Sequence, residues 1–124
     1  MTSAEVVERW LTAINHHDVD GLTSLTPDDF LFVDSLGNSL VSAPTMKIAW
    51  QAYFKMCPDY WVRADLTIAD GDTLLLAGEA GGTIDGVAWK IPSAWKAVVR
   101  DGLVREWRVF ADNKPVYEIL AKRS

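Results

Sequence analysis

The sequence is poor in the residues that build disulfides and metal sites. Its 124 residues include one cysteine, Cys57, and two histidines, His16 and His17. A single cysteine excludes an internal disulfide and any multi-cysteine zinc site within this sequence, and it is compatible with a reducing compartment. No third ligand is spaced to join the adjacent histidines around a metal. We therefore expect no metal site.

Basic residues and long apolar runs are also scarce. Lys and Arg number 12 against 17 Asp and Glu, so the net charge is −5. Such a chain lacks the basic field that nucleic acid binding requires. No apolar run is long enough to span a bilayer, and the first residues lack a basic start followed by an apolar core. We expect a soluble, cytoplasmic protein with no nucleic acid or membrane partner.

Aromatic residues, in contrast, are plentiful: six Trp, four Phe and three Tyr. Large flat side chains line small-molecule pockets as well as cores, and for any single one the core is the more common place. The length fits one domain over residues 1–124, large enough to bury a core.

The first half of the chain has the spacing of helices. Thr2 and Glu5 have capping-box spacing before a predicted helix over 3–15, and Asp18 can cap a short second helix. A third helix is predicted from Pro44 to the residues before Pro58. The apolar stripes of the first and third helices are Val7, Trp10, Leu11 and Ile14, and Met46, Ala49, Trp50, Tyr53 and Met56.

The second half has the pattern of strands joined by tight turns. Three Asp-Gly pairs begin at Asp70, Asp85 and Asp101 and suit hairpins. They predict a four-stranded antiparallel meander, followed by a helix capped by Asp112 or Asn113. The predicted strands are 60–69, 73–83, 87–100 and 103–111.

Alternation along these strands identifies the face that turns inward. In the strand 87–100 the inner set includes Trp89, Ser93 and Trp95, and Ser93 is its one polar member. In the last strand we place Trp107 and Val109 inward. A curved meander with three helices across its concave side gives an α+β architecture with a pocket between the layers.

One short stretch, 30–34, ends an apolar run with a carboxylate. In a strand, Phe30, Phe32 and Asp34 share a face, so an acid stands at the end of an aromatic row. If that face lines the pocket, Asp34 is the best candidate for chemistry. The alternative is that Asp34 accepts backbone N–H bonds in the turn at 35–37, a common role of Asp.

Several segments resemble known families. Residues 7–15, 18–22 and 33–37 resemble the opening of ketosteroid isomerases. Residues 58–59, 82–86 and 106–112 are similar to the wider SnoaL-like polyketide cyclase group. Both groups belong to the nuclear-transport-factor-two-like, or cystatin-like, superfamily. The resemblance implies a cone made of a curved antiparallel sheet and N-terminal helices, the fold that the pattern also predicts.

The isomerase resemblance also implies roles for particular residues. Asp34 matches the aspartate that moves a proton between carbons, and Trp10 and Ser93 match the two hydrogen-bond donors of the oxyanion hole. An indole N–H and a hydroxyl can donate, but both are weaker acids than the groups they replace. Elsewhere, Val109 stands where limonene-epoxide hydrolases carry a catalytic aspartate, and Ile84 where the cyclase group often has a histidine.

Two functions follow from these residues. The first is a cofactor-free acid–base enzyme, an isomerase, cyclase or dehydratase, that acts on an apolar carbonyl compound with Asp34 as general base while Trp10 and Ser93 hold the oxygen. The second is a non-catalytic binding protein for an apolar metabolite. In both, the predicted pocket residues are Phe30, Phe32, Trp50, Tyr53, Trp95, Trp107 and Val109.

Other residues have simpler interpretations. Tyr53 could donate a hydrogen bond to a ligand, Cys57 suits packing, and Asp112 suits a helix cap better than the pocket mouth. Val98, Val104 and Phe110 are predicted on the outer sheet face. Because relatives commonly pair through that surface, we expect a homodimer.

Overall fold

The first helix begins and ends where the sequence predicts. In the computed structural model, which describes residues 1–122, helix α1 spans Ser3–Asn15. The last two residues of the predicted domain lie outside this range. Thr2 and Glu5 form the capping box, with the Glu5 N–H donating to Thr2 Oγ1 over 3.1 Å. Val7 and Ile14 of the apolar stripe are buried, Leu11 is partly buried, and Trp10 is fully inaccessible.

The next two helices are also fixed by caps. Helix α2 spans Val19–Ser24, and the Asp18 carboxylate accepts the Gly21 N–H over 2.9 Å. Helix α3 spans Ala43–Met56, and its cap is Ser42, whose hydroxyl accepts the Thr45 N–H. These caps satisfy N–H groups that have no partner within the helix.

The predicted meander forms the main part of a six-stranded sheet with the order β2-β1-β6-β5-β4-β3. In two of its hairpins the Asp and the Gly of the turn both have positive φ, as a type I′ turn requires. The φ angles are 52° at Asp85 and 78° at Gly86 in one turn, and 56° at Asp101 and 74° at Gly102 in the other. The strands are β1 Leu31–Val33, β2 Ser39–Val41, β3 Trp61–Asp70, β4 Thr73–Ile84, β5 Val87–Arg100 and β6 Leu103–Ala111.

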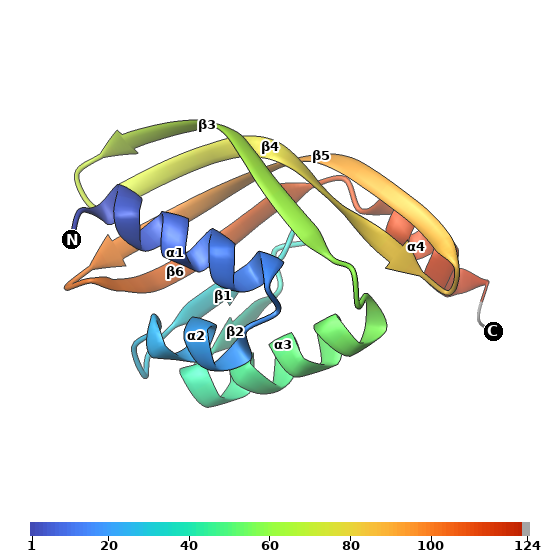
Figure 1. Ribbon diagram of the computed structural model, residues 1–124, viewed down its shortest axis with the longest axis horizontal. Helices are drawn as coiled ribbons and strands as arrows, with labels where there is room; N and C mark the ends of the chain where they lie inside the picture. The colour runs from blue at the N-terminus through green and yellow to red at the C-terminus, as the bar shows by residue number, and fades with distance from the viewer. Residues whose placement is uncertain (123–124) are drawn as a thin grey trace.

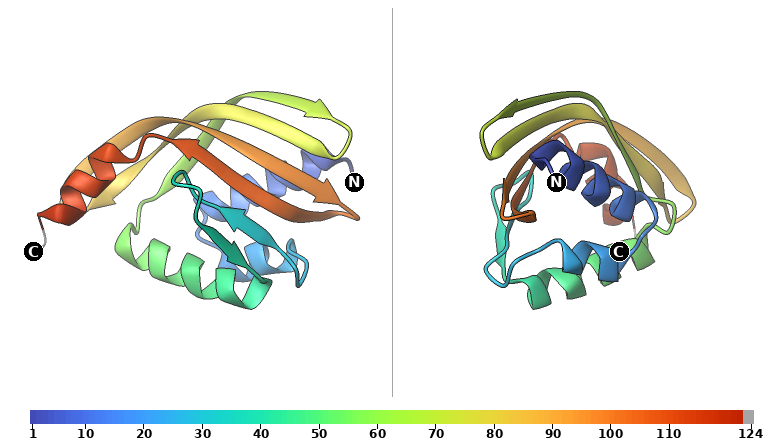
Figure 2. Two further views of the ribbon diagram at one scale, coloured as in Figure 1. Left: turned by 180° about the vertical axis from the view of Figure 1, so that it is seen from behind. Right: turned by 60° about the vertical axis from the view of Figure 1, so that its left-hand side comes forward.

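The sheet is larger and less uniform than the sequence indicates. Strand β2 was not predicted, and β1 pairs with β6 in parallel, so one neighbouring pair breaks the antiparallel pattern. Figure 2 shows β1 and β2 extending the sheet beside β6. Strand β1 lies within the predicted stretch 30–34, whereas β2 has three residues, too few to show a period of two in the sequence.

The prediction that Val104 lies on the outer face is wrong. Val98 pairs with Glu106 and Val99 with Val104, so Arg105 has no residue opposite it and forms a bulge. One extra residue reverses the alternation, because successive side chains point to opposite faces. Val104 is therefore fully buried.

The helices and the sheet form an α+β fold of the cystatin-like type, as predicted. Helix α1 lies across the concave face of the curved sheet, and α2 and α3 cover the open side (Figure 1). Helix α4, Lys114–Ala121, packs against β4 and β5 at one end of the sheet. No helix within residues 1–122 is long and apolar enough to cross a membrane.

Candidate functional site

A cavity of about 270 Å³ lies between α3 and the concave face of the sheet. Its walls come from α3, the end of β1 and strands β4, β5 and β6. Seven aromatic side chains line it: Phe32, Trp50, Tyr53, Tyr60, Trp89, Trp95 and Trp107. Such a wall provides a large apolar surface, which suits an apolar ligand.

The periods of the elements explain which side chains reach the cavity. On α3 the lining residues are separated by three or four positions, and on β5 by two, so each set shares one face. From α3 they are Met46, Ala49, Trp50 and Tyr53, and from β5 they are Trp89, Ile91, Ser93 and Trp95.

Asp34 follows the last residue of β1 and lines the cavity. Its Oδ1 accepts the backbone N–H groups of Leu36 and Asn38, both over 2.9 Å. These bonds build the turn that the alternative interpretation of Asp34 predicts. Oδ2 has no hydrogen-bond partner within residues 1–122, so one oxygen of Asp34 holds the turn and the other makes no bond to the described residues.

Ser93 on β5 and Asp34 after β1 both lie near the C-terminal end of β6, the strand between them. Ser93 pairs with Ala111, the last residue of β6, and Val33, which precedes Asp34, pairs with Arg108 of β6. Ser93 is buried, and its hydroxyl donates to the Ile91 carbonyl over 3.3 Å, a long bond that a ligand oxygen could replace.

Trp10 and Phe30 do not line the cavity, in contrast to the prediction. Both are fully buried, with ring centroids 5.8 Å apart. Trp10 also packs against Trp50 and Trp107, which do line it, at 6.1 and 5.8 Å. Its indole N–H is buried without a partner among the described residues. Trp10 thus belongs to a layer behind the wall, and Phe30 lies in the loop before β1.

Tyr53 and Tyr60 form a second polar region. Their rings meet edge to face with centroids 4.8 Å apart, and both line the cavity. Burial raises the pKa of both phenols, so both remain protonated at neutral pH. Sequence reasoning placed Tyr53 on the inner stripe but missed Tyr60, which precedes β3 in a loop without periodicity.

Asn113 is a further lining residue that the sequence did not identify. Its amide Nδ2 donates to Ser35 Oγ over 2.7 Å and joins the start of α4 to the turn after β1. Asp112 lies outside the lining, and its carboxylate accepts the Lys114 N–H over 3.0 Å. The cap position of α4 is Asn113, which makes no side-chain cap bond, and the Asp112 bond forms the turn that leads into the helix.

Cys57 is buried in packing and does not line the cavity. Its thiol donates to Asp59 Oδ1 over 3.7 Å, and burial raises the pKa of the thiol. A Cβ on Gly82 would lie 2.4 Å from Cys57 Sγ, so glycine is needed there for close packing.

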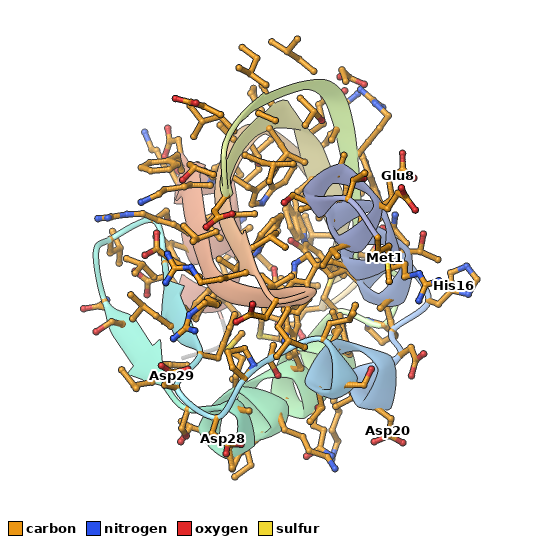
Figure 3. The ribbon with its side chains drawn as sticks, turned by 90° about the vertical axis from the view of Figure 1, so that its left-hand side faces the viewer. Met1, Glu8, His16, Asp20, Asp28 and Asp29 are labelled. Carbon is orange, nitrogen blue, oxygen red and sulfur yellow. The ribbon has the colours of Figure 1, made fainter. Side chains whose placement is uncertain are left out.

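Several ionisable side chains away from the cavity face solvent. Glu8, His16, Asp20, Asp28 and Asp29 lie at the periphery and point away from the core (Figure 3). Within residues 1–122 no three His, Cys, Asp or Glu side chains are grouped to hold a metal ion.

Comparison with known families agrees with this architecture. The family model of the SnoaL-like domain matches residues 7–107. The chain belongs to this family. No curated protein matches the sequence of this SnoaL-like chain.

Solved structures share the SnoaL-like fold at low identity. A candidate SnoaL-like polyketide cyclase from Shewanella denitrificans has a TM-score of 0.86 at 12% identity, over 97% of each chain. An epoxide hydrolase of the limonene-epoxide-hydrolase-like type from Mycobacterium tuberculosis has 0.83 at 18%, over 97% of this chain and 90% of its own. A protein with a ketosteroid-isomerase-like fold from Catenulispora acidiphila, bound to trimethylamine, has a TM-score of 0.79 at 20% identity, over 88% of this chain and 86% of its own.

Proposed function

We propose that this SnoaL-like protein is a cofactor-free acid–base enzyme that acts on a small apolar carbonyl compound, with Asp34 as general base. One observation carries the proposal: among the residues that the structure describes, Asp34 supplies the one carboxylate in the cavity lining, beside seven aromatic side chains. A carboxylate in the lining can take a proton from the carbon of a ligand that the aromatic walls hold.

The reaction would begin with a C–H bond next to the ligand's carbonyl. Asp34 Oδ2 takes this proton, and the electron pair of the C–H bond moves to the carbonyl oxygen to form an enolate. The Ser93 hydroxyl donates a hydrogen bond to that oxygen. The protonated carboxyl, which is half-buried and can exchange its proton with solvent, then returns a proton to carbon, which completes an isomerisation or prepares a cyclisation or dehydration.

The bonds to Oδ1 support this role for Asp34. Two backbone N–H groups hold Oδ1, so the carboxylate has a fixed orientation before a ligand arrives. The structural neighbours include a candidate cyclase and an epoxide hydrolase, which supports an enzymatic role. Because Val109 stands where limonene-epoxide hydrolases carry an aspartate, we do not propose epoxide opening.

A second candidate function is the binding of an apolar metabolite without catalysis. The same two bonds to Oδ1 favour it, because they are sufficient to explain an aspartate at this turn. In that case the aromatic wall provides the affinity, and Asp34 shapes the loop.

The substitution Asp34→Asn separates the two candidates. The amide oxygen that this substitution introduces can still accept both backbone N–H groups, so the turn should persist while the base is lost. We expect the enzyme-catalysed exchange of the α-hydrogens of 2-tetralone in D2O, followed by NMR, to fall about 10²–10⁴-fold.

Asp112→Asn is the matched control, because Asp112 lies outside the lining. It should leave the exchange rate unchanged. Exchange at the wild-type rate in Asp34→Asn would contradict the proposal. Binding of 2-tetralone without any exchange above the buffer rate in the wild type would favour the second candidate.

A further inference from the structure

The cavity has a polar region that the proposed reaction does not use. Tyr53 lies on α3, three residues after Trp50 and on the same helical face. Tyr60 precedes β3 and meets Tyr53 edge to face. The pair brings two phenols together from two different elements.

The tyrosine pair and Asp34 come from different elements of the cavity lining. Asp34 follows β1 and Tyr60 precedes β3, and the sheet order places β6, β5 and β4 between these two strands. A ligand that reaches both regions therefore needs a polar group at each end.

Both phenols lack partners for their hydroxyl groups. Within residues 1–122 neither hydroxyl makes a hydrogen bond, and the 2.7 Å contact between His17 and Tyr60 involves the Tyr60 backbone carbonyl. A ligand acceptor can therefore bond to either hydroxyl without breaking a hydrogen bond within the protein. Because burial also keeps both phenols protonated, they act as donors.

We infer that Tyr53 and Tyr60 form an oxygen-recognition site that selects ligands carrying a second oxygen, a phenol or ketone, at the end away from Asp34. The inference rests on the proposed function for the orientation of the ligand. The cavity, about 270 Å³, is near the lower limit of about 300–1,000 Å³ for ligand pockets. The substrate class is thus a small, flat, apolar ring compound with oxygen at both ends.

A matched pair of probes tests this inference. 6-Hydroxy-2-tetralone and 2-tetralone differ in one hydroxyl at the end of the molecule away from the ketone. The wild type should bind the hydroxylated compound about tenfold more tightly, measured by calorimetry. Tyr53→Phe and Tyr60→Phe keep the rings but remove the hydroxyls, so each should bring the affinity ratio toward one with the affinity for 2-tetralone unchanged.

Tyr117→Phe is the matched control, because Tyr117 is exposed and outside the lining. It should keep the wild-type ratio. A ratio near one in the wild type, an unchanged ratio in both cavity variants, or no binding of either probe would overturn the inference. If one variant does not fold, the other still decides.

The two proposals can fail separately. Asp34→Asn should abolish α-hydrogen exchange and keep the affinity ratio. If exchange survives in Asp34→Asn while the tyrosine variants lose selectivity, the proposed base is wrong and the oxygen-recognition site stands. If exchange is lost but the tyrosine variants remain selective, the base stands and the inference fails.

Discussion

Trp10 shows how one residue on the expected helical face can lie outside the site. The indole packs edge to face on Trp50, with an interplanar angle of 71°, and also contacts Trp107. These two residues form the cavity wall, so Trp10 supports the wall from behind. The isomerase resemblance implies that Trp10 binds a ligand oxygen. In our proposals, side-chain hydroxyl groups bind the ligand oxygens instead.

Removal of the Trp10 side chain should therefore affect stability more than chemistry. Trp10→Ala leaves a large cavity among Phe30, Trp50 and Trp107, and we expect the free energy of unfolding in urea to fall by about 3–5 kcal/mol. Trp10→Phe keeps an aromatic ring and should retain α-hydrogen exchange per folded molecule. If Trp10→Phe is stable but no longer catalyses α-hydrogen exchange, Trp10 has a role in the reaction itself.

At the scale of elements, the connection from α3 to β3 is fastened to β4 by Asp59. Its Oδ1 and Oδ2 accept from the Thr83 N–H over 2.7 Å and from the Thr83 hydroxyl over 2.8 Å. These bonds lower the pKa of the Asp59 carboxyl. The bonds thus hold the segment that carries Tyr60 against the sheet.

The lowered pKa makes this stabilisation depend on pH. The unfolded chain binds the proton of Asp59 at a higher pH than the folded chain, so the contribution is present above about pH 3.9 and is lost as the pH falls through the folded pKa. Asp59→Asn should lower the melting temperature at pH 7, and the difference from the wild type should shrink toward about pH 2.5.

Asp28→Asn is the control for this effect, because it makes the same chemical change in an exposed side chain that points to solvent (Figure 3). Its melting temperature should follow that of the wild type at every pH. A difference between Asp59→Asn and the wild type that is constant from about pH 7 to about pH 2.5 would argue against the assigned role of the carboxylate.

The elements with a strong local signal could be predicted from the sequence. Helix α1 has a capping box and a complete apolar stripe, and the Asp-Gly pairs fix two of the hairpins through positive φ angles. Strand β2 is too short for periodicity, and the pairing of β1 with β6 depends on contacts distant in sequence. The bulge at Arg105 likewise comes from the pairing of β5 with β6, and no residue type near Arg105 predicts it.

The same limits apply to the candidate site. Side chains on α3 and β5 that line the cavity follow from helical and strand periods, as Trp50, Tyr53 and Ser93 show. Tyr60 and Asn113 lie at the ends of elements, where no period indicates their direction. Periodicity also does not distinguish residues that line the cavity from residues buried behind them. It predicts that Trp10 faces inward, but not that Trp10 lies behind the cavity wall. The chemical roles of Asp34 and Ser93 remain predictions.

At the scale of the whole molecule, the convex face of the sheet carries an apolar stripe. Leu66, Ala77, Ala94 and Phe110 pair in sequence across β3, β4, β5 and β6, so they form one row. The adjacent row begins with Ile68 and Leu75. The large residues of the stripe are about half exposed, from 49% for Phe110 to 58% for Ile68. A contiguous apolar area of this kind indicates an interaction surface.

We propose that a second copy of the chain covers this stripe. The Lys96–Glu106 and Arg63–Glu79 ion pairs lie beside it, so the surface carries both signs of charge. A twofold interface places the same patch on both subunits, and a patch with both signs can complement itself. Light scattering at micromolar concentration should give about twice the 13.8 kDa mass of the chain.

Charge in the stripe should separate the subunits, because a twofold axis brings each new carboxylate close to its copy in a setting with little water. Leu75→Glu and Phe110→Glu should therefore yield the monomer mass with unchanged secondary structure. Ile48→Glu is the matched control, since Ile48 is 68% exposed on α3, away from the sheet. A monomeric wild type, or dimers that survive both stripe substitutions, would show that a second copy does not occupy this face.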